Sequence, residues 1–447
     1  MALSGIQIFK MMPKKNCGEC GVPTCLAFAM NLAAGKAELD SCPYVSDEAK
    51  QALASASAPP IRTVEIGTGE KMVKTGGETV LYRHDKTFNN PTAFGCLVST
   101  SDDDATVDSK LKAFKELKYE RVGLTLKPEI IAIKDGADPG RFVKLAKKAS
   151  DAGAALILVS DNADTMKAAL AEVGKEKPLI YAATDANLDA YADLAKEFSC
   201  PVAAKSDCVG NVAKLSAKLM DKGLKDIVLD SGNRKMSELL RDNVMIRRLA
   251  LESLYRPLGF PTIIFPCEMA DNPVDEAIVT GTFVSKYGGI AILSDLRGEV
   301  LFPLLLQRLN IFTDPQRPMT TEQGIYPINN PGKDSPVLIT SNFSLTYFIV
   351  SGEVESSRVP SWLLVLNTDG LSVLTAWAAG KFVADLIGPF VKKSGIEDKT
   401  KTRTIVIPGA AAIISGDLEE ELGGWKVAIG PREGAHIPAY LRQNYAK

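Results

Sequence analysis

The sequence predicts an α/β protein in three parts: a small cysteine-rich module, a (β/α)8 TIM-like barrel and a second, C-terminal α/β domain. Three observations support this prediction. Half of the eight cysteines fall between residues 17 and 42, short apolar runs alternate with amphipathic stretches from about 93 to 315, and further strand-like runs follow. A chain of 447 residues has room for about three domains.

Residues 1–57 form the first part, which contains Cys17, Cys20, Cys25 and Cys42 in the spacing C-x2-C-x4-C-x16-C. Four thiolates from one short segment suit a structural zinc ion or a [4Fe-4S] cluster. Zinc ribbons usually repeat the C-x2-C pair, whereas the second half here offers only Cys42, followed by proline. We therefore favour the [4Fe-4S] cluster over a zinc knuckle, and both over a disulfide framework.

The residues around these cysteines predict their local structure. Gly18 and Gly21 allow the backbone to fold tightly and to direct N–H groups at sulfur. Thr24 is expected to cap a helix that runs from Cys25 to Gly35. Because the module is too small for a large core, the metal group should hold it together. A stretch of Ala, Ser and Pro, Ala52–Pro60, predicts a linker that lets the module move.

Residues 58–92 are predicted as linker and approach segment, with short strands at 61–66 and 79–82. Residues 93–325 form the predicted barrel, and an open doubly wound sheet is the alternative. The expected barrel strands are Ala93–Ser99, Arg121–Leu126, Ala154–Val159, Pro178–Ala183, Cys200–Lys205, Asp226–Asp230, Pro261–Phe265 and Gly289–Ser294. Polar residues after these strands could bind a ligand or partner, without an assigned role: Asp161, Asn162, Thr184, Asp185, Asn187, Ser206, Asp207, Asp230, Ser231 and Asn233.

Residues 326–447 form the third part, predicted as a Rossmann-like domain. Its expected strands are Pro336–Thr340, Trp362–Leu366, Thr404–Ile407 and Trp425–Ile429. Small or polar turns follow each strand, and such turns at the end of a parallel sheet commonly bind a nucleotide-like ligand. The chain has neither G-x-G-x-x-G nor a P-loop motif. We expect a bulky ligand, neutral or zwitterionic, and weigh it equally against a purely structural lid.

Composition restricts the partners. The net charge is −2, from 52 basic and 54 acidic residues, so neither nucleic acid nor an anionic membrane is expected as a partner. The longest apolar helix candidate, Leu371–Val391, contains Lys381 and Asp385 and is too polar to span a bilayer. The chain begins without the apolar stretch of a signal peptide, so a cytoplasmic location is expected.

Several segments together resemble a known family. They are the stretch Ile6–Lys10, the cysteine spacing with Gly-Val-Pro-Thr-Cys25, the segment Gly76–His84, the barrel pattern and the tail Ile429–Pro438. The sequence resembles the large subunit of the corrinoid/iron–sulfur protein, whose archaeal counterpart is the gamma subunit of the acetyl-CoA decarbonylase/synthase complex. The resemblance covers essentially the whole chain, and its most specific part is the cysteine motif.

The resemblance implies a methyl carrier of the reductive acetyl-CoA (Wood–Ljungdahl) pathway. A cob(I)amide would accept a methyl group from methyltetrahydrofolate through a separate methyltransferase and pass it to acetyl-CoA synthase. The [4Fe-4S] cluster would return Co(II) to Co(I) with an electron from a low-potential donor or reductive activator. The resemblance further implies a heterodimer with a small corrinoid/iron–sulfur protein subunit. The chain would thus act as a corrinoid-dependent carrier within a methyltransferase system.

The resemblance also implies that the turns of the third part form the cobamide site. Its candidate residues are Thr340, Ser341, Thr346, Gly370, Leu371, Ser372, Val373, Leu374, Thr375, Pro408, Gly409, Ala410, Gly430, Pro431, Arg432, Glu433, Gly434, Ala435 and His436. Two other classes of function stay open: an iron–sulfur electron-transfer protein, and a barrel enzyme with an accessory cluster.

Overall fold

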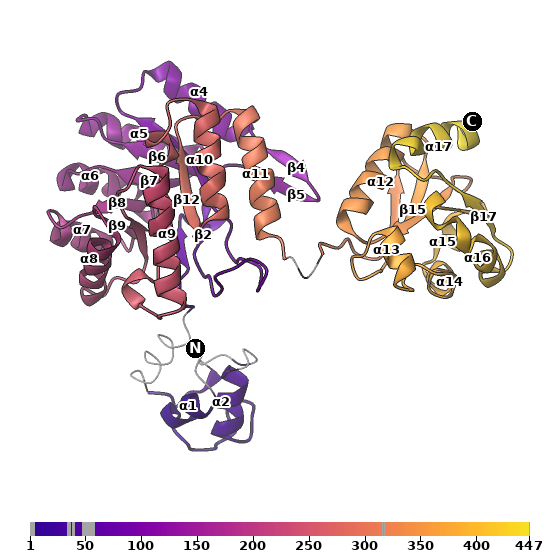
Figure 1. The fold of residues 1–447 in the computed structure, drawn as a ribbon, viewed down its shortest axis with the longest axis horizontal. Coiled ribbons are helices and arrows are strands. Elements are labelled where there is room, and N and C mark those ends of the chain that lie inside the picture. The colour runs from indigo at the N-terminus through magenta and orange to yellow at the C-terminus, as the bar shows by residue number, and fades with distance from the viewer. Residues whose placement is uncertain are drawn as a thin grey trace. The chain divides into compact units, whose positions relative to one another are not determined.

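The computed structural model of the chain describes residues 5–33, 37, 41–46, 59–314, 316 and 318–446. The chain forms two compact units (Figure 1). One runs up to Ile311, and the other consists of Phe312 to the C-terminal end with the segments Tyr82–Thr87 and Tyr119–Leu126. Most of the predicted linker, 52–58, lies outside the described residues.

The N-terminal module contains two short helices, α1 (Gly5–Met11) and α2 (Cys25–Ala33). Their apolar faces pack on one another around Ile8 and Phe28, which are both almost fully buried. Gly5 lies close to Met30 of α2, since a Cβ at Gly5 would lie 3.1 Å from the Met30 Cα.

Eight parallel strands close into a barrel in the order β10-β11-β12-β3-β6-β7-β8-β9, so the predicted barrel is confirmed. The strands are β3 (Ala93–Ser99), β6 (Ile130–Lys134), β7 (Ala155–Val159), β8 (Leu179–Ala183), β9 (Val202–Lys205), β10 (Ile227–Asp230), β11 (Thr262–Ile264) and β12 (Gly288–Leu293). The helices are α4 (Asp104–Glu116), α5 (Pro139–Asp151), α6 (Ala163–Val173), α7 (Leu188–Glu197), α8 (Val209–Asp221), α9 (Met236–Leu251), α10 (Pro273–Ser285) and α11 (Gly298–Phe312).

One predicted barrel strand, Arg121–Leu126, is wrong. This segment is part of an antiparallel hairpin of β4 (Tyr119–Arg121) and β5 (Leu124–Leu126). Val122 and Gly123 both have positive φ, of 54° and 74°, which makes the tight turn of a two-residue hairpin. The barrel strand next to β3 is instead β6, an apolar run that is buried on both faces.

The approach segment also differs from its prediction. A hairpin of β1 (Val64–Ile66) and β2 (Val73–Thr75) is present, whereas the strand predicted at 79–82 is absent. The carbonyl of Val80 accepts hydrogen bonds from the Arg247 side chain instead of from a neighbouring strand. Val64 and Ile66 belong to the same apolar cluster as the first inward residues of the barrel, so the β1–β2 hairpin closes the amino-terminal end of the barrel.

The C-terminal unit contains a five-stranded sheet in the order β13-β15-β14-β16-β17. Its strands are β13 (Gly324–Ile328), β14 (Val337–Ser341), β15 (Ser361–Leu366), β16 (Thr404–Ile407) and β17 (Lys426–Ile429). β13 is an antiparallel edge strand that the sequence reading missed, and the other four strands are parallel. Their order is not that of the dinucleotide-binding Rossmann fold, so only the wider prediction of an α/β domain is established.

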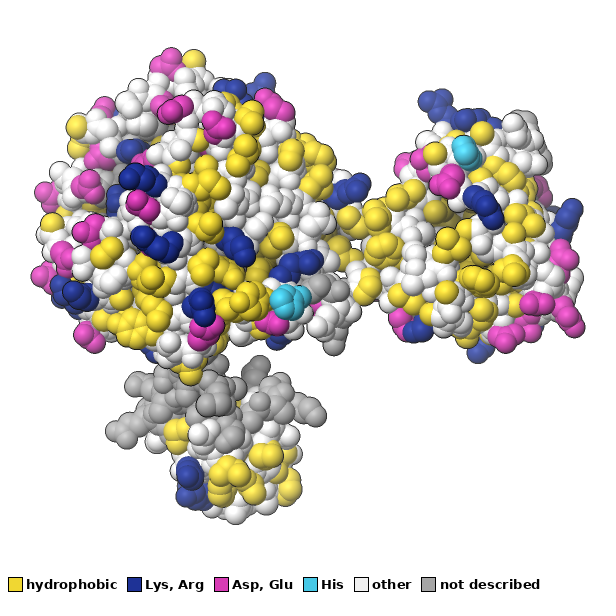
Figure 2. Space-filling view, viewed as in Figure 1, with side chains coloured by type: hydrophobic (Ala, Val, Ile, Leu, Met, Phe, Trp, Pro, Cys, Tyr) yellow, Lys and Arg dark blue, Asp and Glu magenta, His cyan; other side chains and the backbone are white. Residues whose placement is uncertain are grey.

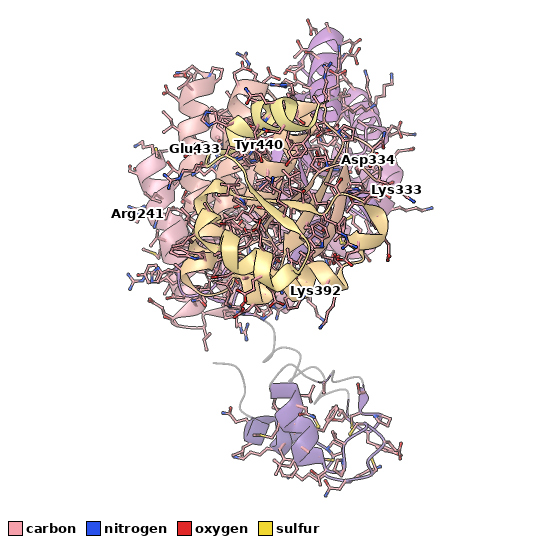
Figure 3. All side chains as sticks on the ribbon, turned by 90° about the vertical axis from the view of Figure 1, so that its right-hand side faces the viewer. Arg241, Lys333, Asp334, Lys392, Glu433 and Tyr440 are labelled. Atoms are coloured by element: carbon pink, nitrogen blue, oxygen red, sulfur yellow. The ribbon has the colours of Figure 1, made fainter. Side chains whose placement is uncertain are left out.

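Helices cover both faces of this sheet. Helix α12 (Ser344–Ser357) packs with α17 (Ile437–Tyr445) on one face, around Val354 and Leu441. The other face carries α13 (Val373–Ala378), α14 (Ala384–Lys393), α15 (Ile396–Lys399) and α16 (Ser415–Leu422). Figure 3 labels Tyr440 of α17 and Lys392 of α14 on opposite sides of the sheet.

The apolar stretch 371–391 is thus two helices with a break between them. In the part of the chain that the structure describes, every helix is too short or too polar to cross a bilayer.

Candidate functional site

A pocket of about 290 Å³ opens at the carboxyl ends of β14, β16 and β17. Numbered among themselves, the four parallel strands have the order 2-1-3-4, so the chain leaves β14 and β16 in opposite directions. Open α/β sheets bind ligands at this kind of switch point. Figure 3 labels Glu433 at this end of the sheet, and Lys333 and Asp334 at the other end.

The loops after β16 and β17 shape the pocket floor by close backbone contact. The Gly409 N–H donates to the Pro431 carbonyl at 3.0 Å, and the Gly430 N–H donates to Ile407 at 2.9 Å. A Cβ on Gly409 would lie 2.5 Å from the Gly430 carbonyl oxygen, which is too close for any side chain. Glycine at 409 is therefore required by packing between the two loops.

Two hydroxyl groups at the end of β14 are buried without a partner. Thr340 is 1% exposed and Ser341 is fully buried. Within the described part of the chain, neither hydroxyl has a hydrogen-bond partner. An unpaired buried hydroxyl costs on the order of 1–3 kcal/mol, so such groups in native proteins call for an explanation. Thr340 lines the pocket, and a bound ligand could supply the missing partner.

Asn342 organises the loop that follows β15. Its side-chain oxygen accepts hydrogen bonds from the N–H groups of Thr368 and Gly370, at 2.9 and 3.0 Å. Gly370 has a φ of 75°, and a Cβ there would lie 2.9 Å from the methyl of Thr320. This loop leads directly into α13, so Asn342 positions the residues at the start of that helix.

The structure brings many of the predicted cobamide residues together. Those that line the pocket are Thr340, Thr346, Ser372, Val373, Leu374, Pro408, Ala410, Gly430, Pro431, Arg432 and Gly434. The predicted residues that lie outside the lining are Ser341, Gly370, Leu371, Thr375, Gly409, Glu433, Ala435 and His436. His436 is exposed, and no histidine lines the pocket.

The residues that sequence reasoning missed are apolar: Leu338, Ile339, Ile349, Val350, Val406, Ile407 and Ile437. Most of them are strand and helix positions with the same pattern as ordinary core. Ile349 of α12 is 49% exposed, and Leu374 of α13 is 55% exposed. Figure 2 shows hydrophobic side chains gathered on the visible face of the C-terminal unit, with the charged ones mostly at its margin.

The N-terminal module holds the four predicted metal ligands. Thr24 caps α2 as expected, because its hydroxyl accepts from the Ala27 N–H at 3.1 Å. Gly18 and Gly21 have φ values of 78° and 84°, and the Gly21 N–H donates to the Gly18 carbonyl at 3.0 Å. Among the residues that the structure describes, however, the N–H that points at sulfur comes from neither glycine. It belongs to Asn16 and lies 3.4 Å from the Cys25 sulfur.

Asn16 makes two hydrogen bonds that connect the loop to Cys25 at the start of α2. Its side-chain oxygen accepts from the Cys25 N–H at 2.8 Å, in addition to its own N–H on the sulfur of that residue. Asn16 has a φ of 50°, in the left-handed region that asparagine tolerates better than most residues. Farther along, the Tyr44 hydroxyl donates to Glu19 at 2.9 Å and links the Cys42 segment to the same loop.

The four cysteine thiols suit a cysteine-ligated metal group, although the structure does not bring all four sulfur atoms together. All four thiols are free of disulfides; Cys25 and Cys42 are buried, and Cys20 packs against the same apolar cluster. Cys17 is exposed, and within the described residues no three His, Cys, Asp or Glu side chains lie close enough to hold a metal ion. Apolar surroundings and N–H···S contacts are the usual environment of an iron–sulfur cluster.

Comparison with known proteins identifies the family. A family model described as the CO dehydrogenase/acetyl-CoA synthase delta subunit matches residues 63–441, and a second one, described as "Putative Fe-S cluster", matches residues 12–44. The corrinoid/iron-sulfur protein large subunit of Moorella thermoacetica is 46% identical over 448 residues and covers 100% of both chains. The chain belongs to the corrinoid/iron-sulfur protein large subunit family.

Archaeal members are similar over the same length. The acetyl-CoA decarbonylase/synthase complex subunit gamma of Archaeoglobus fulgidus is 36% identical, over 99% of this chain and 98% of that protein. The subunit of the same name from Methanothermobacter thermautotrophicus is 33% identical, over 99% of both chains. The resemblance read from the sequence is therefore confirmed at the level of the family, and residues 12–44 match an iron–sulfur family model.

Proposed function

We propose that the chain is the methyl-carrying subunit of a corrinoid-dependent methyl-transfer system in the acetyl-CoA pathway, and that the C-terminal pocket holds a cobamide. The observation that carries this proposal is the buried, unpartnered hydroxyl of Thr340 in an apolar pocket at the switch point of the sheet. Family membership over the full length of the chain supports it.

The chemistry of the pocket suits a large, mostly neutral ligand. Apolar residues such as Ile349 and Val373 form the wall, hydroxyl groups of Thr340, Thr346 and Ser372 offer hydrogen bonds, and Arg432 is the charged residue in the lining. A bound cobamide supplies a cobalt centre that carries the methyl group. The residues of this chain would bind the macrocycle at its edge and exclude water from one face.

The size of the pocket implies a second protein surface. A volume of about 290 Å³ is at the lower end for ligand pockets and smaller than a cobamide. The rest of the ligand would therefore be covered by a partner, and exposed apolar side chains such as Leu374, Trp377 and Ile413 offer a surface for it. We assign this role to the small corrinoid/iron–sulfur protein subunit in a heterodimer, with the methyltransferase and acetyl-CoA synthase as alternating partners.

The cysteine module would serve to reduce a corrinoid that has lost one electron. The methyl group would pass as a cation equivalent: the electron pair of Co(I) would form the cobalt–carbon bond and would return to cobalt when the group leaves, so a complete cycle would need no outside electron. Occasional loss of one electron from the corrinoid would stop the cycle. A [4Fe-4S] cluster on Cys17, Cys20, Cys25 and Cys42 could return that electron from a low-potential donor.

The test is to purify the chain without oxygen, alone and with its small subunit, and to record its absorbance spectrum and the mass of any released cofactor. The proposal predicts a corrinoid together with a cluster absorbance. A cluster absorbance without corrinoid in both preparations would contradict it and favour an electron-transfer protein. Corrinoid bound with unchanged affinity by a Thr340→Val variant would contradict the assignment of the pocket.

A further inference from the structure

The mouth of the barrel carries a polar layer that the proposed function does not use. Inward positions alternate along each strand, and on β6 and β9 the buried residues Ala132 and Ala203 face the barrel core. Two residues farther along, the same alternation brings Lys134 and Lys205 to the carboxyl end. On the neighbouring strand β10, Asp230 is the register partner of Lys205. Barrel enzymes build their sites at this end.

A network of ion pairs occupies part of this mouth. Arg234 donates to both carboxylate oxygens of Asp230, at 3.2 and 3.0 Å, and to the Tyr181 hydroxyl at 3.2 Å. It also donates to Glu268 at 2.7 Å, and Lys134 donates to the other oxygen of Glu268 at 3.3 Å. Burial, together with the charge of Asp230, raises the pKa of Tyr181, so its hydroxyl stays a donor to Asp230.

Each oxygen of both carboxylates thus accepts at least one hydrogen bond. The Oδ1 atom of Asp230 accepts from Arg234 and from the Gly232 N–H, and Oδ2 accepts from Arg234 and Tyr181. Although partial burial would raise the pKa of Glu268, hydrogen bonds from Arg234 and Lys134 hold it below the ordinary value, so Glu268 is charged at neutral pH.

Lys205 is left without an acceptor. Its ammonium group lies 5.4 Å from the centre of the Tyr181 ring, and no ion pair or hydrogen bond of its side chain is found among the described residues. Lys134 and Arg234 are paired with the carboxylates of Glu268 and Asp230, whereas Lys205 is not. An ammonium group above an aromatic ring, with three donors free, suits an anion from solution.

We propose that the barrel mouth binds a small ligand with a phosphate or carboxylate group, held by the ammonium of Lys205 above Tyr181 and flanked by Lys134. The side chain of Lys134 is 45% exposed and has donors left after its bond to Glu268. The residues of this site belong to the barrel unit, whereas those that line the C-terminal pocket belong to the other unit.

The test is titration calorimetry of the full-length protein at constant ionic strength, with inorganic phosphate in one arm and malonate in the other. Three variants accompany the wild type. Lys205→Gln removes the charge, Lys205→Arg keeps it, and Lys214→Gln removes an exposed lysine from helix α8 of the same βα unit. The loss of one charge-assisted contact should weaken binding roughly tenfold or more.

We expect phosphate or malonate to bind with similar affinity to the wild type, to Lys205→Arg and to Lys214→Gln. Binding to Lys205→Gln should be weaker by roughly tenfold or more. The arm with the tighter binding identifies whether the natural ligand carries a phosphate or a carboxylate. Equal binding by Lys205→Gln and Lys214→Gln would overturn the proposal, because the anion would then bind elsewhere. Lack of binding by the wild type in both arms would also overturn it.

Discussion

The barrel and the C-terminal sheet both end their parallel strands at one edge, yet the two edges have opposite chemistry. At the barrel mouth, Asp230 and Glu268 are already bound by Arg234 and Lys134. At the edge of the sheet, the wall is apolar and the Thr340 hydroxyl is unpaired. In both units, the carboxyl ends of the parallel strands are therefore the expected place for a ligand. The side chains at that place determine which class of ligand can bind.

The largest expected effect is a loss of iron without a loss of corrinoid, caused by a substitution in the cysteine module. In Cys20→Ala, iron content and the reductive reactivation of the protein should be lost, because one of the four proposed cluster ligands is missing. Corrinoid content should be unchanged, since the C-terminal pocket is intact. Iron and cobalt analysis checks this, with Cys208→Ala as control, an exposed cysteine of the barrel unit. Equal loss of both metals would show that the module and the pocket depend on each other.

The next effect tests the ion pair between Arg234 and Asp230 at the barrel mouth. The Asp230 side chain is 0% exposed, and Arg234→Ala removes the cation that pairs with it. The carboxylate would then be buried without a positive charge beside it. Removal of one partner from a buried pair typically costs about 3–5 kcal/mol. Denaturant unfolding should show this loss, whereas Arg248→Ala, whose pair with Glu252 is exposed, should change stability by less than about 0.5 kcal/mol. Similar values for the two variants would mean that Asp230 finds another partner.

A smaller effect tests the close approach of the loops below the C-terminal pocket. Gly409→Ala places a methyl group 2.5 Å from the Gly430 carbonyl oxygen, so one loop must move. We expect a loss of about 1–3 kcal/mol in the free energy of unfolding and weaker corrinoid retention. Gly416→Ala is the control, because it lies in α16 with open space around it and should stabilise the helix by about 0.5–1 kcal/mol. If Gly409→Ala behaves like the control, the loops are not held as described.

The smallest effect compares two buried threonines. Thr340→Val should leave stability unchanged or slightly higher, because its hydroxyl has no partner to lose. Thr92→Val should cost about 1 kcal/mol, since the Thr92 hydroxyl donates to the Gly288 carbonyl at 2.6 Å. Corrinoid retention should fall only in Thr340→Val. A clear loss of stability in Thr340→Val would show that its hydroxyl is already satisfied in the free protein.

Much of the fold could be predicted because buried parallel strands are continuous apolar runs. The error at Arg121–Leu126 has a specific cause: the hairpin turn at Val122-Gly123 lacks the usual Asn-Gly or Asp-Gly signal, so two short strands look like one. The edge strand β13 was missed because it includes Pro327, and proline is permitted in an edge strand but disfavoured inside a sheet.

The candidate site was predictable where backbone chemistry dominates. The glycine and proline turns after β16 and β17 carry their own signal, and most of them meet at the pocket. Apolar lining residues such as Ile349 could not be distinguished from core residues by pattern alone. The role of Asn16 was also hidden, because its contact with Cys25 depends on a left-handed backbone conformation that the sequence leaves undetermined.

The most direct test of the account is the number of corrinoid molecules bound per chain in two variants, measured by cobalt analysis and absorbance. Ala410→Trp fills the C-terminal pocket, which has a volume of about 290 Å³, and Lys205→Gln alters the barrel mouth. We predict that Ala410→Trp loses the corrinoid and keeps its iron, whereas Lys205→Gln keeps both. Retention of the corrinoid by Ala410→Trp, or its loss from Lys205→Gln, would contradict the placement of the cobamide in the C-terminal pocket.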